Sequence, residues 1–569
     1  MDNIVFLIFR RLRPPLITLL LVYSISVLGL VLIPGQDAEG HLWHMDFFHA
    51  FYFVSYMSTT IGFGEIPYEF TDAQRLWVTV AMYISVISWL YAIGTIITLF
   101  QDKTFQHALA ESKLAWRIRN LREPFYLICG YGETGSALVR GLTDVGQHVV
   151  VVEIDENRCN LIQLENLRDY VPVLHGDAQI PRHLQETGLQ NPLCQAVVAV
   201  TNDNEANLKI AITSKLLHPD IRVICRADSH DVEKNMASFG TNHIIDPYDT
   251  FATNLATAFQ VPCLYLLKTW LFSGDENHEL DEPIYPPTHG HWIVCGYGRF
   301  GKSVYERLKQ EGVKVTVIEA DPSSTGEPLE GVIHGRGTEA DTLQQAEIER
   351  ASGLIAGTND DTNNLSIVVT ARELNPDLFI IVRQNQYENS TIIDAVNADM
   401  VMHPSNIIAD KIRVLLGTPM LYQFISLAYY QENDWACELV SRISALVGRH
   451  VPRLEELEIN SQHAPAVIDV FTHGEVVRLE DLLRDPWERE SPLNCIVLML
   501  ERHNERVLLP GPEVEIRKGD RLLICGGRRG FNRLHWNLQH DNVLSYVRTG
   551  KVVKHGWLWS KLSRAAGQK

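Results

Sequence analysis

Two long apolar runs without charged residues lie within the first hundred positions of the chain. The first extends from Pro15 to Pro34 and the second from Leu76 to Phe100. Each is long enough to cross a bilayer, which takes about 20 residues of helix. A cleaved signal peptide is the alternative for the first run, but its apolar stretch exceeds the usual length of about 7 to 15 residues. We therefore expect two membrane-spanning helices, at about residues 15–34 and 76–100.

From residue 125 onward, short apolar runs alternate with helical segments, which is typical of a parallel α/β fold. The alternation occurs twice and is followed by a smaller α/β region. These patterns predict a membrane domain at 1–100, a linker at 101–124, α/β domains at 125–288 and 289–432, a C-terminal subdomain at 433–535 and a tail at 536–569.

The two α/β copies share a glycine motif. FYLICGYGETGSALVRGLTDVGQHVVVVEID at 125–155 aligns with HWIVCGYGRFGKSVYERLKQEGVKVTVIEAD at 291–321. GxGxxG directly after a strand, with an acidic residue about 20 residues later, predicts a dinucleotide-binding Rossmann fold. The glycines let a pyrophosphate approach the helix N-terminus, and the acidic residue is placed to bond ribose. The candidate nucleotide-binding residues are Gly130, Gly132, Glu133, Thr134, Gly135, Glu153 and Asp177, and in the second copy Gly296, Gly298, Arg299, Phe300, Gly301, Glu319 and Arg336.

The two candidate nucleotide sites differ in charge. Glu133 of the first copy corresponds to Arg299 of the second, and Asp177 corresponds to Arg336. A carboxylate beside a phosphate is unfavourable, whereas Arg299 can pair with a diphosphate. We therefore expect the second site to bind an anionic dinucleotide or an ADP-like ligand. A Rossmann fold that binds no ligand is the alternative.

Positive residues flank both apolar runs. They are Arg10, Arg11 and Arg13 before the first run, and Lys103, Lys113, Arg117, Arg119 and Arg122 after the second. Because lysine and arginine concentrate on the cytoplasmic side of a membrane, both termini are expected in the cytoplasm. The predicted location is the cell inner (plasma) membrane, with two spans.

The net charge of -19 argues against a nucleic-acid partner, because proteins that bind nucleic acid normally present a basic face. The nine cysteines lack the CxxC spacing that would indicate a zinc site or a disulfide framework. Cys129, Cys225 and Cys295 lie in apolar strand-like runs, so we expect buried reduced thiols.

The aromatic-rich segment between the apolar runs ends in a glycine motif, and we expect a short re-entrant helix and loop at about residues 43–65. Such a loop is tolerated only where its backbone is buried by protein or lines a watery path. Glycine lets consecutive carbonyls turn toward one axis, where they replace the hydration shell of a potassium ion. The candidate filter residues are Thr60, Ile61, Gly62, Phe63 and Gly64.

Thr60 to Glu65, TIGFGE, resembles the potassium-channel signature TVGYGD. Phe63 lacks the tyrosine hydroxyl that usually bonds the surrounding aromatic cuff, and Glu65 is longer than the usual aspartate. These departures bear on the rigidity of the filter more than on its selectivity. The resemblance implies K+ as the permeant ion and four copies of the chain around one pore.

The second span carries three candidate gating residues. Gly94 is a candidate hinge, and Ile97 or Phe100 is a candidate hydrophobic constriction near the cytoplasmic mouth. Close helix packing is the alternative reading for a small residue such as Gly94.

The duplicated half is similar to the RCK domains of potassium channels and to the regulatory subunits of Trk/Ktr potassium uptake systems. The similarity covers about residues 125–530, and Arg336 departs from the family's acidic residue. It implies crossover helices, at Tyr248–Leu271 and Ser405–Tyr430, through which RCK domains pair. The segments that carry it are GDA at Gly176–Ala178, TNDNEANL at Thr201–Leu208 and GTNDDTNNL at Gly357–Leu365.

The fold class implied is a two-span α-helical pore domain plus cytoplasmic α/β, with two tandem Rossmann-like RCK domains and a small C-terminal α/β subdomain. The implied function is a ligand-gated potassium channel subunit, a homotetramer in membrane lipid that binds NAD, ADP or AMP, with Ca2+ as a further candidate and no assigned metal ligands. The alternative is a membrane-anchored NAD-dependent oxidoreductase. We expect no enzyme, because neither glycine loop has a recognisable proton-transfer or hydride-accepting site beside it.

Overall fold

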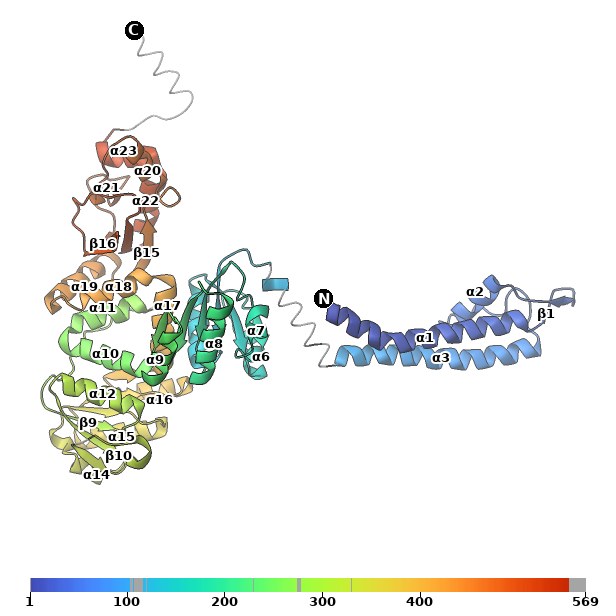
Figure 1. Ribbon diagram of the computed structural model, residues 1–569, viewed down its shortest axis with the longest axis horizontal. Helices are drawn as coiled ribbons and strands as arrows, with labels where there is room; N and C mark the ends of the chain where they lie inside the picture. Colours follow the sequence, from blue (N-terminus) through green and yellow to red (C-terminus); the bar gives the residue numbers. More distant parts are fainter. Residues whose placement is uncertain are drawn as a thin grey trace, which may run out of the picture. The chain divides into compact units, whose positions relative to one another are not determined.

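The computed structural model describes residues 2–102, 106, 116–118, 120–228, 230–273, 278–328 and 330–551. The chain divides into two compact units, residues 1–120 and 121–569 (Figure 1). The predicted linker at 101–124 crosses this division. Its residues 103–105, 107–115 and 119, and residues 552–569 of the predicted tail, lie outside the described part of the chain.

The first unit is built from helices α1 (Asp2–Leu32), α2 (Phe47–Ser58) and α3 (Asp72–Gln101), with a short hairpin of β1 (Gly35–Gln36) and β2 (Leu42–Trp43). Helices α1 and α3 lie along each other, and α2 packs against α1. Two stretches, Phe9–Leu32 and Asp72–Gln101, are long and apolar enough to cross a membrane. The first helix begins earlier than predicted, because it continues through Pro14 and Pro15 and includes the three arginines that precede them.

Polar caps fix where α2 and α3 begin. The Asp46 side chain accepts a hydrogen bond from the backbone of His49 at 2.7 Å, and Thr71 forms a capping box with Gln74 at the start of α3. Such caps satisfy N–H groups that the first helical turn leaves unpaired. The loop between α2 and α3, which includes the predicted filter, is therefore bounded by a defined helix on each side.

The second unit contains two parallel six-stranded sheets of the same topology. The first has the order β5-β4-β3-β6-β7-β8 and the second β11-β10-β9-β12-β13-β14, which is the Rossmann order in both. The duplication predicted from the sequence is confirmed. The strands are β3 (Phe125–Cys129), β4 (His148–Glu153), β5 (Val173–His175), β6 (Cys194–Ala199), β7 (Arg222–Arg226), β8 (His243–Ile245), β9 (His291–Cys295), β10 (Lys314–Glu319), β11 (Val332–His334), β12 (Gly353–Ala356), β13 (Phe379–Arg383) and β14 (Met400–Met402).

The helices of each repeat alternate with its strands along the chain. Those of the first repeat are α5 (Glu133–Asp144), α6 (Glu156–Leu164), α7 (Pro181–Glu186), α8 (Asn204–Leu217) and α9 (His230–Ser238). Those of the second are α12 (Arg299–Gln310), α13 (Pro322–Thr325), α14 (Ala340–Gln345), α15 (Asp361–Leu374) and α16 (Ser390–Ala395).

The helices that leave each repeat cover the other repeat. The pairs are α10 (Pro247–Gln260) with α11 (Pro262–Phe272), and α17 (Pro404–Gly417) with α18 (Pro419–Ala428). Helix α10 leaves the first repeat but packs on α12, and its Leu255 shares a core with Trp292 of β9. Helix α17 leaves the second repeat but packs on α5, and its Ile412 shares a core with Ile128 of β3. Each Rossmann core is therefore completed by a helix from the other repeat (Figure 1).

A C-terminal subdomain follows α19 (Asn433–Val447). Its antiparallel sheet has the order β15-β18-β16-β17, and Phe531, Leu538 and Leu544 lie in one core with strand residues. The subdomain therefore extends beyond the predicted end at residue 535. Its elements are β15 (Arg453–Glu458), α20 (Pro465–Thr472), α21 (Leu479–Leu482), β16 (Cys495–Arg502), β17 (Glu505–Leu508), β18 (Arg521–Gly526), α22 (Arg528–Gln539) and α23 (Asp541–Thr549).

The cysteines follow the sequence expectation in part. Cys129, Cys225 and Cys295 are buried and free, and burial raises the pKa of Cys295 to about 12. Cys263 of α11 and Cys437 of α19 form a disulfide that the spacing did not reveal. The two residues are 174 positions apart and meet only because both helices enter the same core.

The exchange of helices predicts that α17 stabilises the first repeat. Replacing the fully buried Ile412 by alanine should lower the free energy of unfolding of the second unit by about 2 to 5 kcal/mol. Thermal unfolding of the purified full chain, followed by the fluorescence of buried Trp270 and Trp292, would measure this. Leu216→Ala, at a side chain 77% exposed, is the control, and an equal melting temperature for the two variants would contradict the prediction.

Candidate functional site

The predicted filter has an alternating backbone. Thr60, Gly62 and Gly64 have positive φ angles of 62°, 63° and 99°, while the two residues between them do not. In an ordinary extended strand successive carbonyls point to opposite sides, and a reversal of φ at every second residue lets them face one side. Glycine adopts such angles without steric cost, whereas threonine does so only where its surroundings impose them. This geometry is suited to a row of carbonyl ligands.

Side chains from both neighbouring helices contact the C-terminal end of this loop. The Tyr56 hydroxyl of α2 donates to the Gly64 carbonyl at 2.5 Å, and its ring meets the Phe63 ring edge to face at 5.4 Å. The Glu65 carboxylate accepts two hydrogen bonds from the Arg75 guanidinium of α3, at 2.9 and 3.1 Å, and one from the Phe70 backbone at 2.8 Å. Tyr56 thus supplies a hydroxyl that Phe63 lacks, and the longer Glu65 side chain reaches α3.

The three candidate gating residues all lie in α3, which continues unbroken through Gly94. Ile97 and Phe100 are 51% and 61% exposed within the unit. Apolar side chains exposed in this way are available to line or narrow a pore formed by several chains. The hinge and the constriction remain predictions.

The glycine turns of the two repeats share one geometry. Gly130 and Gly296 have φ angles of 101° and 95°, and a Cβ added to Gly135 would lie 2.1 Å from the Gly130 carbonyl oxygen. Glycine is therefore required where α5 packs against the turn. Gly132 caps α5 without a side-chain hydrogen bond, which leaves the first N–H groups of that helix available to an anion.

The acidic residues that end the second strands bond to the glycine turns. Buried Glu153 accepts hydrogen bonds from the backbone of Tyr131 and, at 2.9 Å, of Asp155. Glu319 of the second repeat accepts the corresponding bonds from Tyr297 at 2.5 Å and from Asp321 at 2.8 Å. Both carboxylates therefore tie the turn to the neighbouring strand. The predicted contact with ribose remains a prediction.

A cavity of about 390 Å³ opens at the first glycine turn, lined among others by Gly130, Glu153 and Asp177. Arg158 of α6 also lines it, and a Cβ added to Gly132 would lie 3.5 Å from the Arg158 guanidinium. This guanidinium is beside the turn where a diphosphate is expected. Sequence reasoning missed Arg158, whose only signal was its place on the helix that follows the acidic residue.

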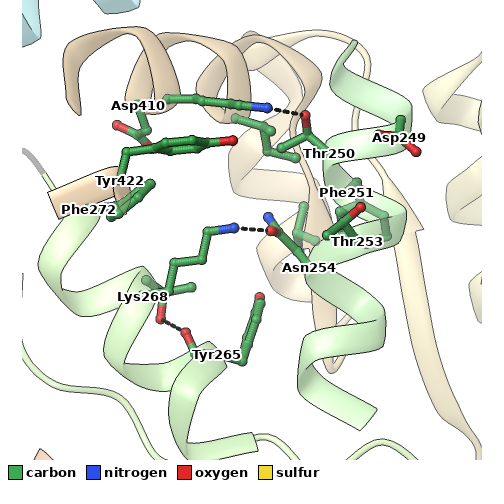
Figure 2. Close-up of a pocket in the computed structure, with 14 residues that line it drawn as sticks. Asp249, Thr250, Phe251, Thr253, Asn254, Tyr265, Lys268, Phe272, Asp410 and Tyr422 are labelled. Carbon is green, nitrogen blue, oxygen red and sulfur yellow. Dashed lines mark hydrogen bonds between the residues drawn. The ribbon is translucent and has the colours of Figure 1, made fainter. Parts of the chain in front are cut away.

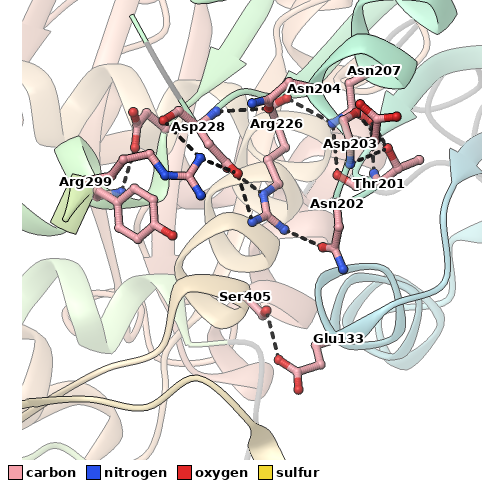
Figure 3. Close-up of polar contacts among 12 residues, drawn as sticks. Glu133, Thr201, Asn202, Asp203, Asn204, Asn207, Arg226, Asp228, Arg299 and Ser405 are labelled. Atoms are coloured by element: carbon pink, nitrogen blue, oxygen red, sulfur yellow. Dashed lines mark hydrogen bonds and ion pairs between the residues drawn. The ribbon is translucent and has the colours of Figure 1, made fainter. Parts of the chain in front are cut away.

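Glu133 contacts the second repeat. Its carboxylate accepts a hydrogen bond from the Ser405 hydroxyl at 3.4 Å (Figure 3). It accepts a second one from the Tyr387 backbone, also at 3.4 Å. These partners give the carboxylate a role in the junction between the repeats.

Arg299 contacts the first repeat in turn. Its guanidinium pairs with the buried Asp228 carboxylate at 3.0 Å and lies over the Tyr248 ring at 5.5 Å. Asp228 also pairs with Arg226 at 2.9 Å, and Arg226 bonds to Asn202 at 2.9 Å (Figure 3). Arg299 would have to leave Asp228 to meet a diphosphate. The charge difference that favoured the second site in the sequence belongs, in the structure, to contacts between the repeats.

The remaining candidate nucleotide-binding residues differ in their exposure. The side chains of Thr134 and Phe300 are buried, Phe300 in the core shared with Trp292, so they do not face a cleft. Arg336 is exposed. Among the described residues, no group of three or more histidine, cysteine or acidic side chains is placed to hold a metal ion.

Comparisons with known proteins agree with this architecture. The ion-channel family matches residues 16–102, and the TrkA-N domain family matches residues 126–247 and 292–404. Potassium channel protein 1 of Methanocaldococcus jannaschii is 25% identical over 251 residues, 43% of this chain and 66% of that protein. A Trk system potassium uptake protein TrkA homolog of Pyrococcus horikoshii is 31% identical over 136 residues, 22% of this chain and 60% of that protein.

A solved structure of the GsuK channel covers 96% of this chain and 100% of its own, with a TM-score of 0.50 and 16% identity, which shows a similar fold. The class of protein is therefore a membrane protein with two spans, in which an ion-channel domain is joined to two TrkA-N domains. These matches support a relationship to RCK-domain potassium channels. The chain aligns with less than two thirds of the length of these two relatives.

The hydrogen bonds to the predicted filter imply that removal of one hydroxyl has a measurable effect. Tyr56→Phe removes the hydrogen bond to Gly64, which is worth about 0.5 to 1.5 kcal/mol and so about a twofold to tenfold shift toward a non-conducting filter. Single-channel open probability in bilayers would measure it. Tyr52→Phe is the control, on the same helix and about half exposed. Equal open probabilities in the two variants would contradict this role.

Proposed function

We propose that the chain is one subunit of a homotetrameric potassium channel whose pore is gated by a nucleotide bound to its RCK domains. The observation that carries the proposal is the loop with alternating φ between α2 and α3, in the same chain as paired Rossmann repeats. Carbonyls arranged along such a loop replace the hydration shell of K+. Neither half alone would favour this function so strongly.

A tetramer follows from the single filter segment. One chain supplies one row of carbonyls, and a ring of ligands needs several copies. Ile61 and Phe63 are 60% and 66% exposed in one chain, which is costly for apolar side chains unless other copies cover them. The family resemblance implies four.

Both termini are proposed to lie in the cytoplasm. The Arg11 guanidinium of α1 pairs with the Asp102 carboxylate just beyond α3 at 2.6 Å, so the start of α1 and the end of α3 are on the same side of this unit. The arginines of α1 and the basic residues that follow α3 then both face the cytoplasm.

The first cleft is the proposed site for NAD, ADP or AMP. Its support is the cavity of about 390 Å³, the Arg158 guanidinium beside Gly132 and the uncapped start of α5. A diphosphate there meets N–H groups and a positive charge. Arg299 at the second cleft is held by Asp228, so we assign the first cleft where the charges in the sequence favoured the second.

Gating requires that the nucleotide bind one conformation of the RCK domains better than another. The first cleft lies at the ends of strands that share a core with α17. Closure of the cleft around a ligand would therefore be coupled to the position of that helix. Movement of the RCK domains would reach α3 through residues 101–124. Gating by Ca2+ stays a prediction of the family resemblance.

Potassium conduction can be measured directly. Purified protein in planar bilayers should conduct K+ in preference to Na+, because the carbonyl ring compensates the dehydration of K+ better. Equal permeability to K+ and Na+ would contradict the proposal. So would the absence of any current both with and without NAD and ADP. Oxidation of NADH by the same protein would instead favour the membrane-anchored oxidoreductase.

Nucleotide binding distinguishes the two clefts. Arg158→Gln should weaken the binding of ADP and NAD by about tenfold or more, because a charged hydrogen bond to phosphate is lost. Calorimetry on the full chain would measure it, with Lys209→Gln on the exposed face of α8 as the control for lost positive charge. If Arg299→Gln weakens binding and Arg158→Gln does not, the second cleft is the site.

A further inference from the structure

A second cavity, of about 340 Å³, lies between the helices that join the two repeats. It is lined by residues of α10 and α11, which follow the first repeat, and of α17 and α18, which follow the second (Figure 2). None of the residues discussed for the nucleotide clefts lines it. This cavity is therefore distinct from the proposed nucleotide site.

Two lysines supply positive charge to the cavity. Lys268 of α11 donates to the Asn254 side chain at 2.5 Å (Figure 2). Lys411 of α17 donates to the Thr250 hydroxyl at 3.3 Å. Within the described part of the chain, neither ammonium has a carboxylate oxygen within the 4.0 Å of an ion pair. A half-buried ammonium that bonds only to neutral groups loses part of its hydration, and a bound anion would offset that cost.

Burial lowers the pKa of both lysines. It lowers the pKa of Lys268 to about 8, with a further contribution from the nearby Lys411 charge. It also lowers the pKa of Lys411, and the charges of Asp249, Asp246 and Glu233 act in the opposite direction. Two carboxylates also line the cavity: Asp410 lies 3.5 Å from the Arg413 guanidinium, and Asp249 is exposed.

The rest of the cavity wall combines aromatic rings with hydroxyls. The Lys268 ammonium lies 5.7 Å from the Phe272 ring centre, and the Lys411 ammonium lies 5.9 Å from that of Tyr422. Tyr265 and Thr253 also line the cavity. Apolar walls with a few convergent polar groups are typical of sites for small organic ligands.

We propose that this cavity binds a small organic anion, with an aromatic or apolar body against the rings and a carboxylate or phosphate between Lys268 and Lys411. Because the two lysines come from helices that follow different repeats, the bound anion bridges the two halves of the second unit. The site is independent of nucleotide in the first cleft.

Benzoate and phenyl phosphate are suitable probes, with neutral benzamide as the matched control of the same size. We expect both anions to bind the purified full chain at least about tenfold more tightly than benzamide in calorimetry. The two anions distinguish a carboxylate from a phosphate ligand. Benzamide binding as tightly as either anion, or no binding of either anion, would overturn the proposal.

Substitutions locate the binding. Lys268→Met and Lys411→Met should each weaken the better anion by about tenfold, since both keep the length of the side chain and lose the charge. Lys309→Met is the control, because its ammonium lies 5.8 Å from the Tyr305 ring centre on exposed α12 surface. Unchanged affinity in both Lys268→Met and Lys411→Met, with melting temperatures like that of the control, would refute the site.

Discussion

The organisation of the second unit depends on the exchange of α10 and α17 between the two Rossmann repeats. A doubly wound sheet must have helices packed on both faces. In this unit, one of the helices that cover each sheet comes from the other repeat. The repeats are therefore one packed body rather than two domains joined by a linker. A change in the shape of one cleft would therefore displace the helices that complete the other core, because close-packed interiors transmit displacement.

This exchange also explains the positions where the duplicated sequences diverge. Residues buried inside each repeat stayed alike: Asn207 and Asn364 each accept an N–H from the loop after the fourth strand and donate to the carbonyl of Arg226 or Arg383. Positions at the junction did not, as Glu133 and Arg299 show. Residues that are the same in both repeats lie inside each repeat, and residues that differ lie at the junction. The packing of the two repeats against each other accounts for both.

Much of the fold was predictable because local patterns determine it. Apolar length gave the two spans, and GxGxxG after a strand with a later acidic residue gave both Rossmann repeats. The alternating backbone at Thr60 to Gly64 agrees with the glycine spacing. The tether from Arg75, the guanidinium of Arg158 and the disulfide between Cys263 and Cys437 were not foreseen, because each depends on which distant elements meet after folding.

The ion pair between Arg299 and Asp228 has a consequence for how chains associate. Asp228 of the first repeat corresponds to Asn385 of the second, and Arg299 corresponds to Glu133. If two first repeats from different chains paired through the same surface, Glu133 would face Asp228, and two carboxylates would meet where an ion pair now forms. The junction thus distinguishes the correct partner from its own near-copy. In the proposed tetramer, which would hold eight similar repeats, such discrimination would keep each first repeat with a second one.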